Sequence, residues 1–228
     1  MKAEAESAAD PPSHIHDALI IGLGFSGTYL LHKVLKLDYD VVALDPNDQL
    51  GGVWNHNTYP GARVDISVPS YQLNLPELHE TDPWEWSEKY PSGEELRKYF
   101  RWVEKRLGIT HACEFGVWVK AAMWNDKVHY WTVTASDRRQ WKARWLLPCL
   151  GYAAAPLMPA WPGLNEKSYP DHVHVLHSAQ WPIEGIDLRG KRVGVVGTGA
   201  SGVQIVQTIV QEVKHLVCSG QCVYGCTC

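Results

Sequence analysis

Two glycine-rich stretches have the residue spacing that binds the phosphates of a dinucleotide. The first is GLGFSG at residues 22–27, and the second is GTGASG at residues 197–202. Glycines at this spacing permit a tight turn and let a pyrophosphate approach the N-terminus of the next helix, where free N–H groups favour anions. The sequence therefore predicts two dinucleotide sites, and two such sites indicate electron transfer between a bound flavin and a nicotinamide.

A third stretch, GGVWNHNTYPGARVD at residues 51–65, lies between them in the sequence and has residue types that suit cofactor contact better than packing. We expect this loop to lie where the two cofactors meet. Its last residue, Asp65, is a carboxylate that such a contact would include. An alternative is that the Asp65 carboxylate caps the backbone N–H groups of its own loop.

The elements around the first glycine stretch support the nucleotide interpretation. Residues 18–21 form an apolar run typical of a buried strand, residues 28–37 have one apolar helical face, and residues 41–44 form a second buried strand that ends at Asp45. The order strand, glycine turn, helix, strand, acid is typical of a dinucleotide fold, in which Asp45 would accept hydrogen bonds from a ribose. A glycine turn in an unrelated α/β unit is the alternative.

The rest of the chain continues the α/β pattern. Residues 93–107 predict an amphipathic helix that serves as scaffold. Three strands, predicted at 115–123, 128–134 and 142–150, form a β-meander insertion. A strand at 193–196 precedes the second glycine stretch, and a helix at 201–213 follows it. Because a doubly wound domain needs several more strands, we expect the second domain to be incomplete.

Composition and cysteine spacing exclude several classes of function. A net charge of -4 and a pI near 6.2 argue against nucleic acid or an anionic membrane as partner. The first sixteen residues have no apolar signal region, which predicts a cytoplasmic protein. The four cysteines from Cys218 to Cys228 lack the pairs of a zinc site, and the histidines at 172, 174 and 177 lack a suitably spaced carboxylate or cysteine, so no metal is expected.

The loop carries a specific resemblance. Residues 51–65 fit the pattern [AG]GxWxxxx[FY]P[GM]xxxD of flavin-dependent Baeyer–Villiger monooxygenases, a branch of the flavin-containing monooxygenases, at every specified position. The chain resembles this family from about residue 17 to residue 216. A second family fingerprint, FxGxxxHxxxW followed by Pro or Asp, keeps His177, Trp181 and Pro182 but not its Phe and Gly. The resemblance implies a Rossmann-like fold that binds two dinucleotides, FAD and NADPH.

The resemblance also implies domains and contacts. The expected divisions are a disordered tail at residues 1–16, an FAD-binding domain at 17–155, a linker at 156–189, the start of an NADPH-binding domain at 190–216 and an unrelated cysteine-rich tail at 217–228. The FAD pyrophosphate and ribose would contact Gly22, Gly24, Ser26, Gly27 and Asp45. The flavin and adenine would contact Val53, Trp54, Asn55, His56, Asp65, Tyr71 and Val119. NADP would contact Arg63, Val64, Asp65, Thr198, Gly199, Ala200, Ser201, Gly202, Val203 and Gln204.

The implied catalytic residue is Asp65. In the family an acid at this position pairs with an arginine that steadies a negatively charged flavin peroxide. Arg63 is not that arginine, which the family supplies from segments absent here. The implied function is an FAD- and NADPH-dependent monooxygenase that inserts one oxygen atom from O2 into a ketone or a related small carbonyl compound. Oxygenation of N or S is the alternative, as is a truncated, non-catalytic FAD-binding remnant. Oligomeric state is left open.

Overall fold

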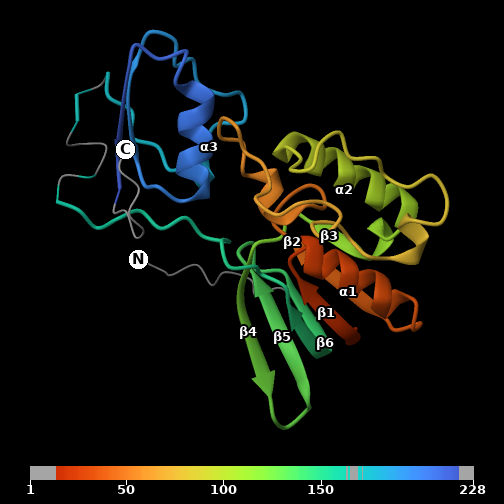
Figure 1. Cartoon of the computed structure of the whole chain (residues 1–228). Coiled ribbons are helices and arrows are strands. Elements are labelled where there is room, and N and C mark those ends of the chain that lie inside the picture. The colour runs from red at the N-terminus through yellow and green to blue at the C-terminus, as the bar shows by residue number, and fades with distance from the viewer. Residues whose placement is uncertain (1–13, 163, 165–168, 171, 221–228) are drawn as a thin grey trace, which may run out of the picture. The chain divides into compact units, whose positions relative to one another are not determined.

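The computed structural model describes residues 14–162, 164, 169–170 and 172–220. The chain divides into two compact units, each assembled from separate segments (Figure 1). The first unit comprises Met1–Gly52, Leu73–Pro83 and Phe100–Tyr152, and the second comprises Val53–Gln72, Trp84–Tyr99 and Ala153–Cys228. The sequence predicts domains that follow one another along the chain. The two units are interleaved instead, because Val53–Gln72 and Trp84–Tyr99 belong to the second unit although segments of the first unit follow each of them.

A six-stranded mixed sheet forms the centre of the first unit, in the order β3-β2-β1-β6-β5-β4 (Figure 1). Its strands are β1 (His16–Ile21), β2 (Val41–Asp45), β3 (Cys113–Phe115), β4 (Val119–Asn125), β5 (Tyr130–Ala135) and β6 (Gln140–Pro148). The pairs β1·β2, β1·β6 and β2·β3 are parallel, whereas β4, β5 and β6 pair antiparallel. The predicted meander is therefore present and joins the parallel strands through β6.

Helix α1 (Phe25–Leu35) connects β1 to β2. It begins at Phe25, three residues before the predicted start at Thr28, because the glycine turn itself includes the N-cap Gly24. All five residues of β2 are buried, as expected for a parallel strand covered on both faces. A cluster of buried residues that includes Leu19, Leu44 and Trp141 joins the parallel strands to the meander.

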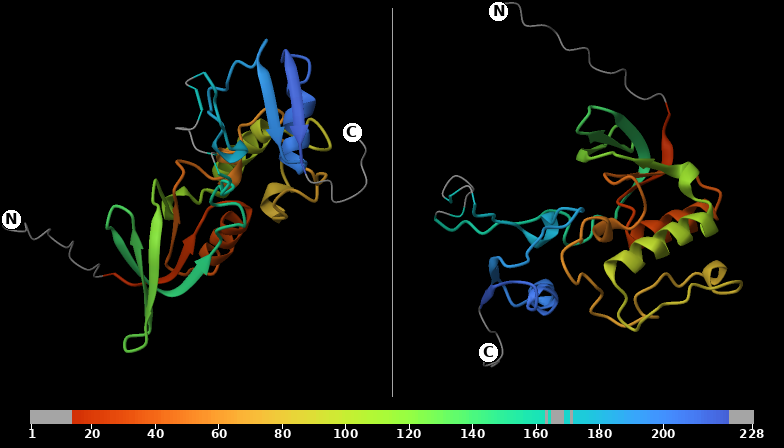
Figure 2. Two further views of the ribbon diagram at one scale, coloured as in Figure 1. Left: turned by 90° about the vertical axis from the view of Figure 1, so that its left-hand side faces the viewer. Right: turned by 90° about the horizontal axis from the view of Figure 1, so that it is seen from above.

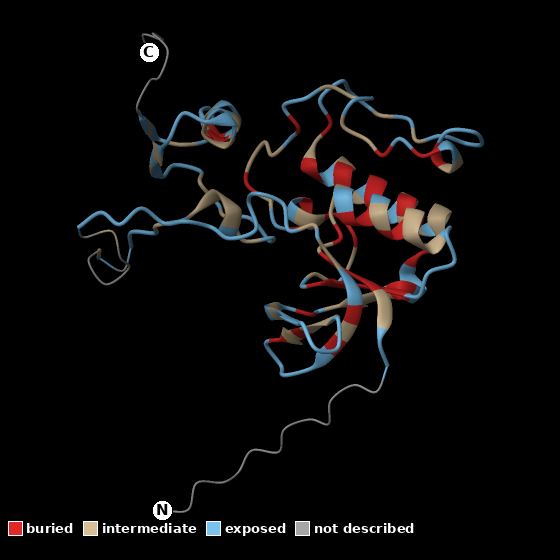
Figure 3. Cartoon of the chain, turned by 90° about the horizontal axis from the view of Figure 1, so that it is seen from below, coloured by how far each residue is buried: buried red, intermediate tan, exposed pale blue. Residues whose placement is uncertain are grey.

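Helix α2 (Gly93–Leu107) has the predicted bounds and one buried stripe (Figure 3). Four of the predicted inward residues, Leu96, Tyr99, Phe100 and Val103, are buried. The division between the units falls within α2. The short helices η1 (Gly52–Asn55), η2 (Pro76–Leu78) and η3 (Thr110–Ala112) form parts of the connections.

The second unit contains β7 (Arg192–Val196), α3 (Ala200–Ile209), β8 (His215–Ser219) and the short helix η5 (Ser178–Gln180). Strands β7 and β8 pair in parallel beside α3 (Figure 2). The core of this unit contains Tyr59, Ile205 and Ile209. Helix α3 is shorter than predicted and ends at Ile209.

Two expected boundaries need correction. The predicted tail at 1–16 extends too far, since β1 begins at His16 and pairs with β6 there. The predicted cysteine-rich tail begins too early, because β8 continues to Ser219 and its last three residues pair with residues 194–196 of β7. Residues 221–228 of that tail lie outside the described residues.

No helix in the described part of the chain has the length and apolar character needed to cross a membrane.

Candidate functional site: two glycine turns and the loop at residues 51–65

The outer glycines of the first turn are required by the packing of the protein itself. Gly22 has φ +97°, and a Cβ added there would lie 2.5 Å from the carbonyl oxygen of Cys149. A Cβ on Gly27, in the first turn of α1, would lie 1.8 Å from the carbonyl oxygen of Gly22. Glycine at these positions permits the tight turn and the close approach of helix to strand.

The middle glycine, Gly24, is not required in this way. It is the N-cap of α1, in an extended conformation (φ -74°, ψ -162°) that other residues adopt readily. The nearest neighbour of an added Cβ is the Cα of Gly52 at 3.6 Å, an ordinary contact. A side chain here would instead occupy the space in which a pyrophosphate approaches the backbone.

In the second turn, too, the packing of the protein requires the outer glycines but not the middle one. Gly197 has φ +113°, and a Cβ on Gly202 would lie 2.3 Å from the carbonyl oxygen of Gly197. Gly199, the N-cap of α3, is extended (φ -70°, ψ 176°), and no atom lies within 4 Å of its added Cβ. Each turn therefore contains one glycine, the middle one, whose requirement is not explained by the protein's own atoms.

Asp45 fixes the first turn from the end of β2. Its carboxylate is buried and accepts hydrogen bonds from the backbone N–H of Leu23 (2.6 Å), the backbone N–H of Asn47 (2.9 Å) and the side-chain amide of Asn47 (2.7 Å). A carboxylate has about four acceptor positions. The predicted contact with a ribose stays a prediction, and the role in holding the turn was not foreseen.

The start of the loop is built on the first turn, within the first unit. The backbone N–H of Gly51 donates to the carbonyl of Leu23 (3.0 Å). Gly52 has φ +55°, and its added Cβ would lie 2.8 Å from the Cα of Gly24. Only glycine, which has no side chain, lets the backbone of the loop approach the turn so closely. The two glycines of the loop pattern thus support the nucleotide turn that precedes them.

The later part of the loop contacts α3, within the second unit. The hydroxyl of Tyr59 donates to Oε1 of Gln204 (2.9 Å) and accepts from the hydroxyl of Ser201 (3.1 Å). The amide of Gln204 donates to the carbonyl of Arg63 (3.0 Å). Gly61 has φ +78°, and its added Cβ would lie 2.1 Å from Oγ1 of Thr208. The predicted residues Ser201 and Gln204 therefore hold the loop through their side chains, and the exposed backbone at Gly199 stays available to a ligand.

The residues predicted to lie along the flavin differ in burial. Trp54 and Asn55 are buried, whereas Val53 and His56 are exposed. The indole N–H of Trp54 donates to the hydroxyl of Tyr71 (3.2 Å), with the two rings edge to face. Arg97 donates to the carbonyl of Trp54 (3.0 Å). Trp54 and Tyr71 thus support each other, and their flavin contacts stay predictions.

Asp65 and Arg63 have different surroundings. The Arg63 guanidinium pairs with Glu88 at 3.1 Å, and both side chains are exposed. The Asp65 carboxylate is also exposed, and within the described part of the chain it makes no hydrogen bond or ion pair. The alternative, in which the Asp65 carboxylate caps backbone N–H groups of its own loop, is therefore not supported by a hydrogen bond among the described residues. Val64, between them, is buried, and its N–H donates to the carbonyl of Pro91 (3.1 Å).

The other predicted site residues are placed as follows. Ser26 is exposed at the start of α1, and Val119 opens β4 and packs against the core of the first unit. Thr198, Ala200 and Val203 are exposed around the second turn. The contacts of these residues with the cofactors stay predictions.

The linker contributes contacts that the sequence did not predict. The carbonyl of Trp181 accepts from the hydroxyl of Thr58 (2.9 Å), and the ring of Trp181 packs on the cluster around Tyr59. His177 accepts from the N–H of Ala179 (3.1 Å) and caps η5. Of the surviving fingerprint residues, Trp181 therefore supports the loop directly, and His177 caps the short helix that precedes Trp181. The sequence signal for this support is the fingerprint itself.

Each unit thus contains a strand, a glycine turn and a helix, the arrangement that defines oxidoreductases with two dinucleotide sites. A family model described as L-lysine 6-monooxygenase/L-ornithine 5-monooxygenase matches residues 84–221, more than half of the chain. The chain belongs to this family of flavin-dependent monooxygenases.

The relatives agree with this assignment. FAD-binding monooxygenase lolF2 of Epichloe uncinata is 41% identical over 200 residues, which cover 88% of this chain and 36% of the relative. Cyclopentanone 1,2-monooxygenase of a Comamonas species is 36% identical, covering 88% and 35%. A crystal structure of OTEMO with FAD and NADP superposes with a TM-score of 0.83 at 30% identity, covering 92% of this chain and 39% of that one. The chain therefore spans a little over a third of these relatives.

The comparisons confirm the predicted resemblance to Baeyer–Villiger and related flavin monooxygenases and the predicted Rossmann-like α/β class. They also confirm that the fold seen here is part of a larger one. The individual site residues stay predictions, supported by the geometry of the glycine turns.

Proposed function

We propose that this chain carries the FAD and NADPH sites of a monooxygenase that inserts one atom of O2 beside the carbonyl of a small ketone. The observation that carries the proposal is the middle glycine of each turn. Among the six glycines of the two turns, Gly24 and Gly199 are the ones for which the fold itself gives no steric or conformational reason. A ligand phosphate at each backbone supplies that reason.

The first turn fits FAD. A diphosphate placed at the N-terminus of α1 would meet backbone N–H groups and the positive end of the helix dipole. Asp45 holds the turn in place through Leu23, and its remaining acceptor position can bind a ribose hydroxyl. The second turn, at the N-terminus of α3, fits NADPH in the same way. The name FAD-binding monooxygenase and the FAD and NADP in the OTEMO crystal support these cofactors.

The bound flavin, once reduced by NADPH, would supply the electrons that activate O2. The chain's own residues would orient the reacting groups and place a charge near them. Asp65 has an exposed carboxylate that is suited to hold a cation near the reacting atoms. Because Arg63 is paired with Glu88, that cation is a group other than Arg63. Gln204 and Tyr59 fix the loop that positions Asp65.

The ketone substrate is supported by the name of one relative, cyclopentanone 1,2-monooxygenase. A second candidate, oxygenation of an amine nitrogen, is favoured by the matching family model, whose name specifies lysine and ornithine, two amino acids with amine side chains. The third hypothesis is that this chain alone binds FAD weakly or not at all and is not catalytic. The cytoplasmic location expected from the sequence stays a prediction.

The test is a product assay on the 228-residue chain. The chain is incubated with FAD, NADPH and O2 and offered cyclopentanone or N,N-dimethylbenzylamine in parallel, and products are measured by mass spectrometry. The proposal expects lactone from the ketone and little N-oxide from the amine. N-oxide without lactone supports the second candidate. Weak or undetectable FAD binding without product from either compound supports the non-catalytic hypothesis.

A matched pair of variants tests the role of Asp65. Asp65→Asn removes the charge with little change of shape, and we expect at least tenfold less lactone with FAD binding retained. Glu85→Gln makes the same change at another exposed acid of the second unit and should leave product within about twofold of the unchanged chain. Equal activity of the two variants would remove Asp65 from the proposed mechanism.

A further inference from the structure

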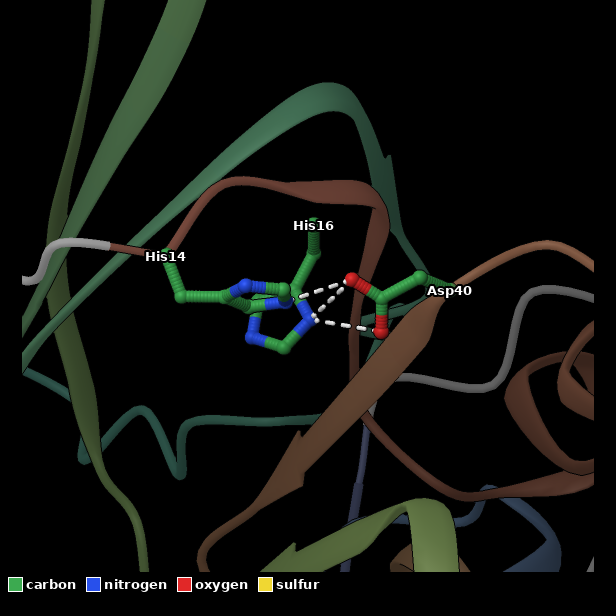
Figure 4. Close-up of side chains that lie close together, drawn as sticks. All are labelled: His14, His16 and Asp40. Carbon is green, nitrogen blue, oxygen red and sulfur yellow. Dashed lines mark hydrogen bonds and ion pairs between the residues drawn. The ribbon is translucent and has the colours of Figure 1, made fainter.

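A cluster of potential metal ligands lies where β1 and β2 begin, within the first unit. Nε2 of His14 lies 2.6 Å from Oδ2 of Asp40, and Nδ1 of His16 lies 3.1 Å from each oxygen of the same carboxylate (Figure 4). The two imidazole rings meet edge to face with centroids 4.5 Å apart. Their nitrogens and the carboxylate oxygen all lie within 4.8 Å of one another.

The backbone holds these three side chains together. His16 is the first residue of β1 and His14 lies two residues before it, and both side chains reach the carboxylate of Asp40. Asp40 precedes β2, which pairs in parallel with β1 from Ala18 onward. The carbonyl of Asp40 accepts from the N–H groups of Asp17 (2.9 Å) and Ala18 (3.1 Å), and its N–H donates to the carboxylate of Asp17 (3.2 Å). The carboxylate is therefore fixed opposite the two histidines before any ligand arrives.

We propose that His14, His16 and Asp40 bind a divalent transition-metal ion of the nickel, copper or zinc class. Two imidazole nitrogens and one carboxylate oxygen are donors that these ions prefer. The nitrogen–oxygen distances of 2.6 and 3.1 Å are close to the separation of about 3 Å between neighbouring ligands of one ion at about 2.0–2.2 Å. The side chains are 65%, 20% and 46% exposed, so ions can reach them and water can complete the coordination.

The charge of the cluster favours a cation. The two imidazoles face one carboxylate, that of Asp40, and a carboxylate is an anion at neutral pH. The sequence does not reveal this site, because His14 and His16 lie in the predicted disordered tail and Asp40 is 24 residues away from His16.

This site is separate from the first glycine turn, which lies in the same unit. It lies at the amino end of β1, whereas the first glycine turn follows the carboxyl end. The six residues of β1 span about 20 Å at about 3.3 Å each. An ion here would join the start of β1 to the start of β2 and stabilise the sheet by binding the folded state. Metal binding at this site can therefore be tested independently of FAD binding.

The test is calorimetric titration of the chain with Ni2+. We expect one ion per chain at this site and at least tenfold weaker binding for His14→Gln, His16→Gln and Asp40→Asn. The control, His129→Gln, changes an exposed histidine of the same unit outside the cluster and should leave the affinity within about twofold. Circular dichroism of each metal-free variant checks that it is folded.

Copper provides a second readout that needs no variant. With one equivalent of Cu2+, the electron paramagnetic resonance spectrum of the unchanged chain should show hyperfine coupling to two imidazole nitrogens. A spectrum with sulfur ligation would assign the metal to the cysteines and overturn the proposal. Nickel binding that is equal in the control and in all three cluster variants would overturn it as well.

Discussion

Replacing Gly61 with alanine tests the contact between the loop at residues 51–65 and α3. Gly61 has φ +78°, and its added Cβ would lie 2.1 Å from Oγ1 of Thr208 and 2.8 Å from the carbonyl oxygen of Gln204. The second unit contains a matched control, Gly185, with φ +77° and no atom within 4 Å of its added Cβ. The two substitutions share the backbone strain and differ in the overlap with α3.

The expected magnitudes follow from these two contributions. Alanine in the left-handed conformation costs about 1–2 kcal/mol, which applies to both variants. Forcing extra atoms into a packed contact costs a further amount of about 1–3 kcal/mol, which applies only to Gly61→Ala. The free energy of unfolding should therefore fall by about 1–2 kcal/mol in Gly185→Ala and by about 2–5 kcal/mol in Gly61→Ala.

Urea unfolding followed by tryptophan fluorescence measures this difference. A Thr208→Ala change in the Gly61→Ala background removes the shorter overlap and should recover part of the loss, so the two changes should not be additive. The reasoning is refuted if Gly61→Ala destabilises the chain no more than Gly185→Ala. That result would mean that the loop does not approach α3 as closely as the structure has it.

Two further predictions concern buried titratable groups. Burial, followed by the nearby acids, raises the pKa of the Cys113 thiol to about 12, so about one molecule in ten thousand carries the reactive thiolate at pH 8. Iodoacetamide should label exposed Cys218 at least a hundredfold faster than Cys113, and peptide mass spectrometry measures both rates. Burial and then Lys36 and Lys33 lower the pKa of His32, so below the unfolded value of about 6.5 the unfolded chain gains a proton before the folded chain does. The free energy of unfolding should fall as pH drops from about 6.5 toward the lowered folded pKa, and His32→Gln should remove that part of the slope.

The local features of the fold could be predicted from the sequence because they depend on short-range chemistry. The strand before Gly22, the turn and α1 follow from an apolar run, a required positive φ and one apolar helical face. The same reasons apply at Gly197 and α3. Helix α2 was predicted with its observed bounds because its apolar residues recur at helical spacing.

The tertiary features could not be predicted because they join residues far apart in the sequence. Tyr59 and Gln204 are separated by 145 residues, and neither has a spacing pattern that reveals the other. Asp45 was predicted to bind a ribose, whereas its hydrogen bond to Leu23 depends on the geometry of the turn. The parallel pairing that extends β8 to Ser219 depends on β7 as its partner, since the residues alone suggested an irregular tail.

The most direct test of two dinucleotide sites is the reciprocal pair Gly24→Ala and Gly199→Ala. Both added methyl groups fit the protein without overlap, so both variants should fold. Fluorescence titrations of each variant measure FAD binding first and then NADP binding at saturating FAD. Our account predicts that Gly24→Ala weakens FAD binding at least tenfold and that Gly199→Ala weakens NADP binding at least tenfold, each with the other cofactor within about twofold. Unchanged affinities in both variants would contradict it.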